Sequence, residues 1–229
     1  MNTLTRIAFA AVLAALAGRA CAADLVKSLE ILRAVGPQGA GNEAATAAWQ
    51  EVARSDAAEL PKLLSALDGA NPLAANWIRT AIDAICERTL REGRSLPQTS
   101  LEQFVLETAH APKGRRLAYE WLLQVDAKAE ERIVPQLLHD PSLELRRDAV
   151  ARLIAQAESA GKPAETADLL KKALDAARDR DQVDTIAKSL KKLDIQADLV
   201  RHDGLVVDWW VIGPFDNTGA KAFDVAYPP

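Results

Sequence analysis

His139-Asp140-Pro141-Ser142-Leu143-Glu144-Leu145-Arg146-Arg147-Asp148-Ala149-Val150 is the segment that says most about the architecture of this chain. Proline cannot continue a helix, because it has no N–H group and its ring clashes with the preceding turn. Asp140 can accept hydrogen bonds from the turn amides, and Ser142 can cap a following helix. The segment therefore predicts a helix that ends before Pro141, a tight turn, and a second helix that begins near Ser142.

Apolar residues recur every three or four positions over most of the remaining sequence, as Leu60, Leu63 and Leu67 illustrate. This spacing is typical of helices that bury one face. Residues with high helix propensity are abundant, and β-branched clusters are scarce before residue 195. We expect an all-α chain with helices at 24–35, 43–54, 57–68, 72–92, 99–110, 113–125, 127–139, 142–159, 164–178 and 181–193.

Signals for helix ends fall between these segments. Asn71-Pro72 places a capping residue before a proline at the first helical position. Thr99 and Glu102 have the spacing of a capping box. Gly69 and Gly93 are placed to end helices, because glycine adopts the left-handed conformation without strain.

Prolines divide the chain at a nearly regular interval. Pro61, Pro97 and Pro135 accompany the first helices of successive pairs, and they lie 36 and 38 residues apart. A recurrence at about 30–40 residues is typical of helical repeat proteins. We therefore predict an α-solenoid of antiparallel helical hairpins, in which each hairpin buries its apolar face on its neighbours.

Residues 139–150 resemble the HEAT-repeat signature, in which an Asp-Pro turn precedes a second helix that carries Arg, Ala and Val. Residues 67–72 are similar but have no Arg-Arg pair after them, and the hairpin at 97–125 has no acidic residue in its turn. The resemblance covers residues 60–159 and implies an armadillo-type helical solenoid that serves as a protein-interaction scaffold. A generic antiparallel helix bundle is the alternative.

The N-terminal segment has the features of a secretory signal peptide. Arg6 precedes an apolar run from Ile7 to Ala17, and Ala20-Cys21-Ala22 supplies small residues at the cleavage positions. A run of this length is too short to span a bilayer about 30 Å thick as a helix. We expect cleavage after Ala22 and a periplasmic or secreted location. Lipoprotein anchoring through Cys21 and a buried N-terminal helix are the alternatives.

The composition limits the partners and cross-links that the chain can have. Its 28 basic and 32 acidic residues are mixed along its length, whereas nucleic-acid binding would require a basic patch or stripe. Cys86 is the one cysteine after the predicted cleavage site, so stability must come from packing instead of a disulfide. No segment after the leader is apolar enough to span a membrane, so we expect no nucleic acid and no membrane span.

The pattern changes after Leu193. Leu205-Val206-Val207-Asp208-Trp209-Trp210-Val211-Ile212 predicts a short C-terminal β segment, and Gly213-Pro214 predicts a turn. Residues 210–217 resemble the opening of a galactose-binding-like β-sandwich found in multidomain exported bacterial proteins. The 25 residues from Leu205 onward cannot close a sandwich, so we expect a fragment of a longer protein. A short natural tail is the alternative.

The predicted organisation follows from these boundaries. It comprises a signal peptide at 1–22, an N-terminal helical hairpin at 23–56, HEAT-like repeats at 57–159, a capping helical hairpin at 160–195, and the start of a truncated β-sandwich at 196–229.

No sequence pattern indicates catalysis. His110, His139 and His202 lie in separate turns or helix ends, and no Cys-x-x-Cys pair completes a zinc ligand set. Ser189-Leu190-Lys191-Lys192 matches the Ser-x-x-Lys pattern of penicillin-binding enzymes but lacks their accompanying motifs. We therefore expect a protein without enzyme activity, cofactor or metal.

The remaining candidates are partner contacts. Trp77 and Trp121 lie on second helices of neighbouring hairpins, where tryptophan is usually core but can anchor a partner if exposed. Arg115 and Arg146 are the two other residues that we expect to contact a partner. We expect a non-catalytic exported scaffold for protein–protein interaction. The alternative is an accessory module of a larger envelope enzyme or carbohydrate-binding protein, which rests on Gly213-Pro214-Phe215-Asp216-Asn217 alone.

Overall fold

A computed structural model describes residues 24–211 and 218–220, and in this part of the chain the structure is all-helical without strands. The predicted signal peptide and residues 213–217 lie outside the described residues. Residues 24–33 are helical. The elements that follow are η1 (Pro37–Gly39), α2 (Asn42–Ala53), η2 (Ala57–Glu59), α3 (Leu60–Ser65), α4 (Pro72–Arg91), α5 (Gln98–Leu106), α6 (Pro112–Val125), α7 (Ala129–Ile133), η3 (Val134–Leu137), α8 (Leu143–Ser159), α9 (Pro163–Ala176), α10 (Arg180–Lys191), α11 (Leu199–His202) and η4 (Thr218–Ala220).

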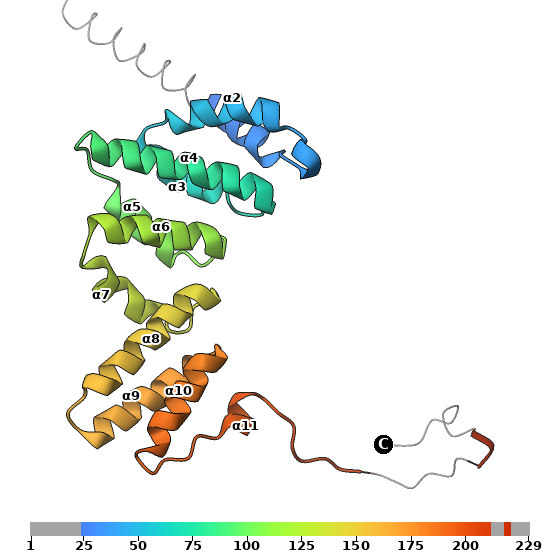
Figure 1. Cartoon of the computed structure of the whole chain (residues 1–229), viewed down its shortest axis with the longest axis vertical. Helices are drawn as coiled ribbons and strands as arrows, with labels where there is room; N and C mark the ends of the chain where they lie inside the picture. The colour runs from blue at the N-terminus through green and yellow to red at the C-terminus, as the bar shows by residue number, and fades with distance from the viewer. Residues whose placement is uncertain (1–23, 212–217, 221–229) are drawn as a thin grey trace, which may run out of the picture.

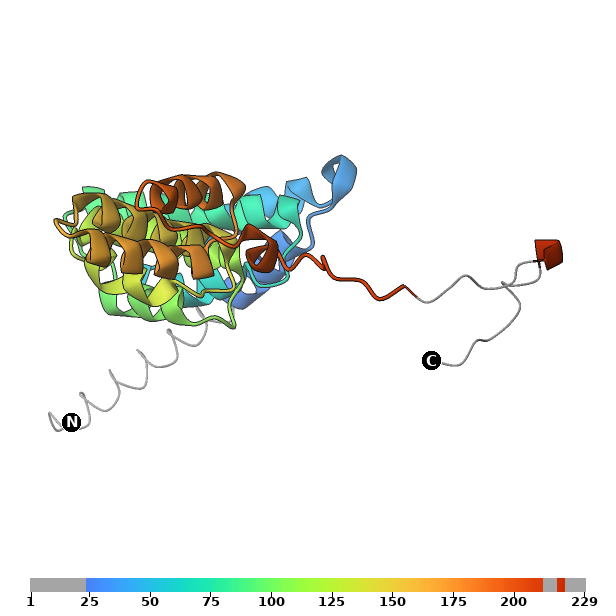
Figure 2. The same cartoon turned by 90° about the horizontal axis from the view of Figure 1, so that it is seen from below.

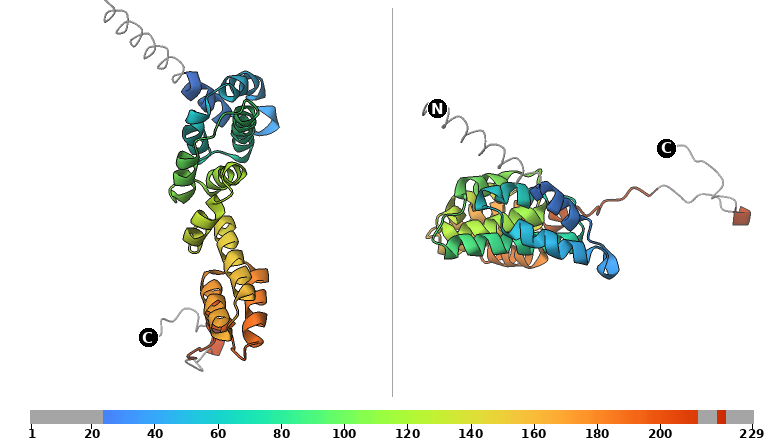
Figure 3. Two further views of the ribbon diagram at one scale, coloured as in Figure 1. Left: turned by 90° about the vertical axis from the view of Figure 1, so that its left-hand side faces the viewer. Right: turned by 90° about the horizontal axis from the view of Figure 1, so that it is seen from above.

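The helices follow one another in chain order along the long axis of the molecule (Figure 1). Helix α4 packs on α2 and α3, α6 packs on α3 and α5, α8 packs on α6 and η3, and α9 packs on both α8 and α10. A second view along the side shows the same elongated body (Figure 3). The most extensive packing therefore joins elements that are close neighbours in the sequence.

A continuous hydrophobic core extends through this body from Leu25 to Leu190. Leucine, isoleucine, valine and alanine make up most of it, as the helical periodicity predicts. One glycine sets a close approach between two helices. A Cβ atom added to Gly114, at the start of α6, would lie 3.2 Å from the carbonyl oxygen of Leu64. A larger side chain at this position would push α6 away from α3.

The predicted starts of two second helices are confirmed. Oδ1 of Asn71 accepts hydrogen bonds from the backbone N–H groups of Leu73 and Ala74, both at 3.0 Å. Oγ of Ser142 accepts one from the N–H group of Leu145 at 3.4 Å. Both side chains satisfy amides that have no partner within the helix.

The first helices of two hairpins are less regular than their sequence pattern predicts. The segment 57–68 consists of the 3₁₀ turn η2 and the short helix α3, and the segment 127–139 consists of α7 and the 3₁₀ turn η3. Pro61 and Pro135 lie in these segments and cannot donate the backbone hydrogen bond of a regular helix. Each first helix is therefore short and interrupted.

The predicted capping box at Thr99 is wrong. Helix α5 begins at Gln98, and its capping position is occupied by Pro97 without a side-chain hydrogen bond. The carboxylate of Glu102 instead pairs with Arg132, at 2.6 Å, in the next hairpin. A contact between hairpins has replaced a contact within one helix.

Hydrogen bonds join the turns of successive hairpins. Nδ2 of Asn71 donates to the carbonyl oxygen of Val35 at 2.8 Å. Further along, Oδ1 of Asp68 accepts from the N–H group of Ala111 at 2.7 Å, and Oδ2 lies 2.7 Å from Nδ1 of His110. These bonds hold neighbouring turns at a defined spacing.

The C-terminal β segment is not confirmed. Residues 205–211 form no strand, and Ile212 lies outside the described residues. The chain leaves the helical body beyond α11 (Figure 2), and Trp209 and Trp210 are 75% and 99% exposed. A strand needs a neighbouring strand to bond its backbone, and no described segment pairs with these residues. Among the described residues, the side chains that can form an enclosed site therefore lie on the helical body.

Candidate functional site

Arg115 and Asp140 form a buried ion pair at the turn before α8. Their side chains are 1% and 3% exposed, and the two guanidinium–carboxylate distances are 2.9 and 2.5 Å. Nε of Arg115 also donates to the carbonyl oxygen of Val105 at 2.7 Å. This bidentate arrangement leaves Arg115 no surface to offer a partner, and it fixes α6 to the turn.

Arg146 reinforces the same turn. Its Nε donates to the backbone carbonyl oxygen of Asp140 at 2.7 Å, and the side chain is partly buried. The structure therefore brings Arg115 and Arg146 together at one aspartate, where their interactions are with the chain itself.

The two tryptophans have different surroundings. Trp121 is 7% exposed, and its Nε1 donates to Oδ1 of Asp83 on α4 at 2.8 Å, so it joins α6 to α4. Trp77 is only partly buried and lines a cavity beside η1. Of the four candidate contacts predicted from the sequence, Trp77 alone lines an open cavity.

Side-chain bonds link each second helix to the next. Most involve partly exposed groups, where an ion pair contributes only about 0–1 kcal/mol, so they set the register of the helices more than their stability. The linked pairs are Trp49–Thr80, Arg79–Glu120, Trp121–Asp83, Arg116–Asp148 and Arg147–Asp181.

A groove of about 720 Å³ lies between α6 and α8. Tyr119 and Leu123 line it from α6, and Arg152 and Gln156 line it from α8. Glu130 reaches it from α7. The groove thus combines an aromatic ring, an apolar side chain and charges of both signs, within the size range of small-ligand and peptide anchor sites.

Arg152 is the unusual member of this groove. Its Nε is enclosed and has no hydrogen-bond partner among residues 24–211 and 218–220. The neighbouring Arg116, by contrast, pairs with Asp148 and lies 3.1 Å from Glu120. Enclosing a cationic donor without an acceptor is unfavourable. The enclosed Nε is itself out of reach, so an acceptor supplied from outside the chain would bond to the terminal nitrogens of this guanidinium, which are not among the enclosed atoms.

Tyr119 supplies a neutral wall to the groove. Burial raises the pKa of its phenol to about 12, so the hydroxyl stays protonated at ordinary pH. The guanidinium carbon of Arg116 lies 5.7 Å from the ring centroid, close enough for a cation–π interaction. Tyr119 is only 3% exposed, so it offers a ligand little surface, and its protonated hydroxyl is not suited to act as a nucleophile.

His110 and Asp68 are a close pair of titratable groups in the described residues, with Nδ1 and Oδ2 2.7 Å apart. Within those residues, no cluster of histidine, cysteine and carboxylate side chains could hold a metal ion. Cys86 is fully buried, and burial raises the pKa of its thiol to about 12. No described helix has both the length and the apolar character needed to cross a bilayer.

Sequence reasoning missed Tyr119, Leu123 and Arg152 as a group. Tyr119 and Arg152 are separated by about one repeat length, and the stacking of α6 on α8 brings both to one groove. A comparison of equivalent positions in consecutive second helices could have predicted that these residues lie together.

Comparison of the chain with models of protein families, with curated proteins and with solved structures finds no match. Its function is therefore inferred from the geometry of the helical body.

Proposed function

We propose that this chain is a non-catalytic, exported scaffold of HEAT-like hairpins, and that the α6–α8 groove binds a carboxylate-bearing segment of a partner protein. The observation that carries the proposal is the guanidinium of Arg152, which lines the groove and makes no hydrogen bond or ion pair with the residues that the structure describes. Export is supported by the leader-like sequence of residues 1–22.

A solenoid architecture is supported by the order of packing. Each second helix contacts the hairpin before it, and Asp68 and Asn71 bond to turns of neighbouring hairpins. In a helical solenoid each repeat contacts only its neighbours, which leaves an extended surface for partners. The Asp-Pro turn at Asp140, held by Arg115 and Arg146, fits the same architecture.

The groove has the composition of a binding hot spot. Arginine is enriched where partner proteins make their strongest contacts. Arginine binds a carboxylate through two parallel hydrogen bonds, and Leu123 offers an apolar surface beside it. Because Glu130 also lines the groove, a single carboxylate flanked by apolar residues fits better than an acidic run.

The test compares three immobilised forms of the full-length chain in envelope extracts: the native chain, Arg152→Met and Arg91→Met. Arg91 is the matched control, because it is exposed at the end of α4 and forms no ion pair among the described residues. Met retains the unbranched apolar part of the side chain but removes the guanidinium group and its charge. Captured proteins are quantified by mass spectrometry, and the affinity of each candidate is then measured by calorimetry.

We expect at least one protein to be captured by the native chain and by Arg91→Met but depleted about tenfold with Arg152→Met, which corresponds to about 1.4 kcal/mol. Capture of the same proteins by all three forms, or of none, would overturn the proposal. Circular dichroism of each variant shows whether the helical content is retained.

A further inference from the structure

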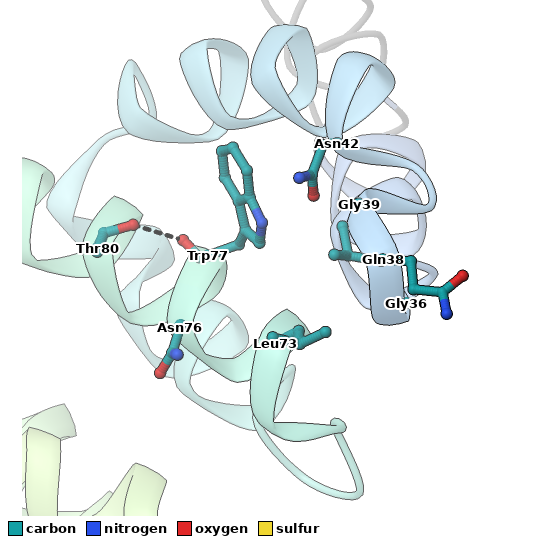
Figure 4. A pocket seen from close by; sticks show the side chains of 9 residues that line it. Gly36, Gln38, Gly39, Asn42, Leu73, Asn76, Trp77 and Thr80 are labelled. Carbon is teal, nitrogen blue, oxygen red and sulfur yellow. Dashed lines mark hydrogen bonds between the residues drawn. The ribbon is translucent and has the colours of Figure 1, made fainter.

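A second cavity lies at the N-terminal end of the helical body, between α4 and the start of α2. It has a volume of about 470 Å³, within the range of small-ligand sites. Trp77 and Leu73 face the η1 loop across it, and Asn42 points from α2 into the space beside the indole (Figure 4). The cavity is remote in sequence from the α6–α8 groove and shares no lining residue with it.

The lining of this cavity carries no charge. None of its nine residues is acidic or basic, although 26% of the whole chain is charged. An ionic ligand would lose its water there without meeting a counter-charge, which is unfavourable. The cavity therefore favours a neutral ligand.

Several polar groups of the cavity have no partner. Among residues 24–211 and 218–220, the amides of Asn42 and Asn76 and the Nε1 of Trp77 make no hydrogen bond. Thr80 differs, because its hydroxyl accepts from Trp49 and donates to the carbonyl oxygen of Trp77, both at 3.0 Å. The free groups include both donors and acceptors, since an amide side chain offers each.

The loop that closes the cavity has an unusual backbone. Gln38, Gly39 and Gly41 have φ angles of +56°, +79° and +84°, and Gln38 is a residue type that rarely adopts this conformation. The hydrogen bond from Asn71 to the carbonyl oxygen of Val35, at 2.8 Å, ties the loop to the start of α4. Strained loops of this kind persist where the surrounding structure holds them, often at binding sites.

We propose that this cavity binds a neutral pyranose sugar. The C–H face of such a ring packs against an indole, and its adjacent hydroxyl groups pair with amides that donate and accept at once. Trp77 supplies the indole, and Asn42 and Asn76 supply the amides. The proposal is independent of partner binding in the α6–α8 groove, because neither site needs the other.

The test is saturation-transfer NMR with the full-length chain, followed by titration to obtain Kd. The probes are glucose, galactose and N-acetylglucosamine, each as the free sugar and as a short oligomer, with glucuronate as the charged comparison. The variants are Trp77→Leu and Asn76→Ala. Trp209→Leu is the matched control, because Trp209 is 75% exposed outside the helical body.

We expect saturation transfer to at least one neutral sugar and weaker binding of glucuronate. Trp77→Leu should raise Kd about tenfold, Asn76→Ala should raise it about threefold, and Trp209→Leu and Arg152→Met should leave it unchanged. Stronger binding of the oligomer than of the free sugar would identify a glycan as the source. If Trp77→Leu does not fold, Asn76→Ala carries the test, since its side chain is exposed.

Two results would overturn the proposal. One is the absence of saturation transfer to every neutral sugar at millimolar concentration. The other is transfer that persists unchanged in both Trp77→Leu and Asn76→Ala, which would place the sugar elsewhere on the chain.

Discussion

Two regions beside helices α6 and α8 each contain an enclosed arginine, but only one of these arginines is paired within the chain: the regions are the turn before α8 and the α6–α8 groove. In the turn before α8, Arg115 is 1% exposed on its side chain and makes bidentate hydrogen bonds to Asp140. In the groove, Arg152 has an enclosed Nε with no acceptor among the described residues. One arginine is satisfied by the chain, and the other is not.

This difference shows what distinguishes a structural charge from a candidate binding charge. Burial alone does not, because both guanidinium groups are wholly or partly enclosed. The presence of hydrogen-bond acceptors distinguishes them, since burying a charge is unfavourable unless its donors are paired. The same substitution at the two positions should therefore have very different consequences for stability.

The largest effect is expected for Arg115→Met. It leaves the carboxylate of Asp140 buried without its partner, which should lower the free energy of unfolding by about 3–5 kcal/mol. Urea denaturation followed by circular dichroism measures the change. Arg91→Met, on an exposed residue, is the control and should change stability by less than about 0.5 kcal/mol. A loss below about 1 kcal/mol for Arg115→Met would show that the turn tolerates an unpaired Asp140.

A smaller, pH-dependent effect is expected at the α8–α10 contact. Hydrogen bonds from Arg147 lower the pKa of Asp181 to about 2, from its usual value of 3.8. A carboxylate with a lowered pKa in the folded state contributes stability above its unfolded pKa, and that stability is lost as the pH falls through the folded pKa. Asp181→Asn should therefore melt below the native chain at pH above about 4, and the difference should shrink toward pH 2.

Thermal melts between these pH values measure this difference. Asp208→Asn is the control, because Asp208 is exposed and forms no ion pair in the described part of the chain. A difference between Asp181→Asn and the native chain that stays constant across the range would contradict the assignment of the Arg147–Asp181 pair.

The smallest effect on stability is expected for Arg152→Met. No hydrogen bond or ion pair of the described residues is lost, and Met retains the unbranched apolar part of the side chain. The free energy of unfolding should change by less than about 1 kcal/mol, and an increase is expected if removal of the enclosed donor dominates. A loss of about 3 kcal/mol in the urea experiment would place Arg152 with Arg115 as a structural charge.

Local sequence signals predicted most of the secondary structure. The helical period and the Asn71 and Ser142 caps depend on neighbours within a few residues, so they can be read without knowledge of the fold. The same reasoning was wrong at Thr99, because Glu102 pairs with Arg132 in the next hairpin. It also overestimated the helices at 57–68 and 127–139, where proline interrupts the backbone hydrogen bonds.

The candidate sites could be predicted only in small part. Trp77 was selected from its helical position, and it lines the cavity beside η1. Arg115 was also among the predicted partner contacts, but Asp140 and Val105 occupy its donors. Arg152 was not selected, because nothing in its immediate sequence shows that its Nε lacks an acceptor.

Local sequence patterns were enough to predict the helices of residues 24–193, the positions of the main turns and the apolar face of each helix, because these depend on periodicity and on contacts within one turn. The hydrogen-bond partners of the charges and amides, in contrast, became known from the packed structure alone. Arg115 meets an acceptor 25 positions away, whereas the Arg152 Nε meets none in the described residues. Whether a polar group has a partner depends on which acceptors or donors the neighbouring hairpin places beside it, and this placement arises only when the hairpins stack.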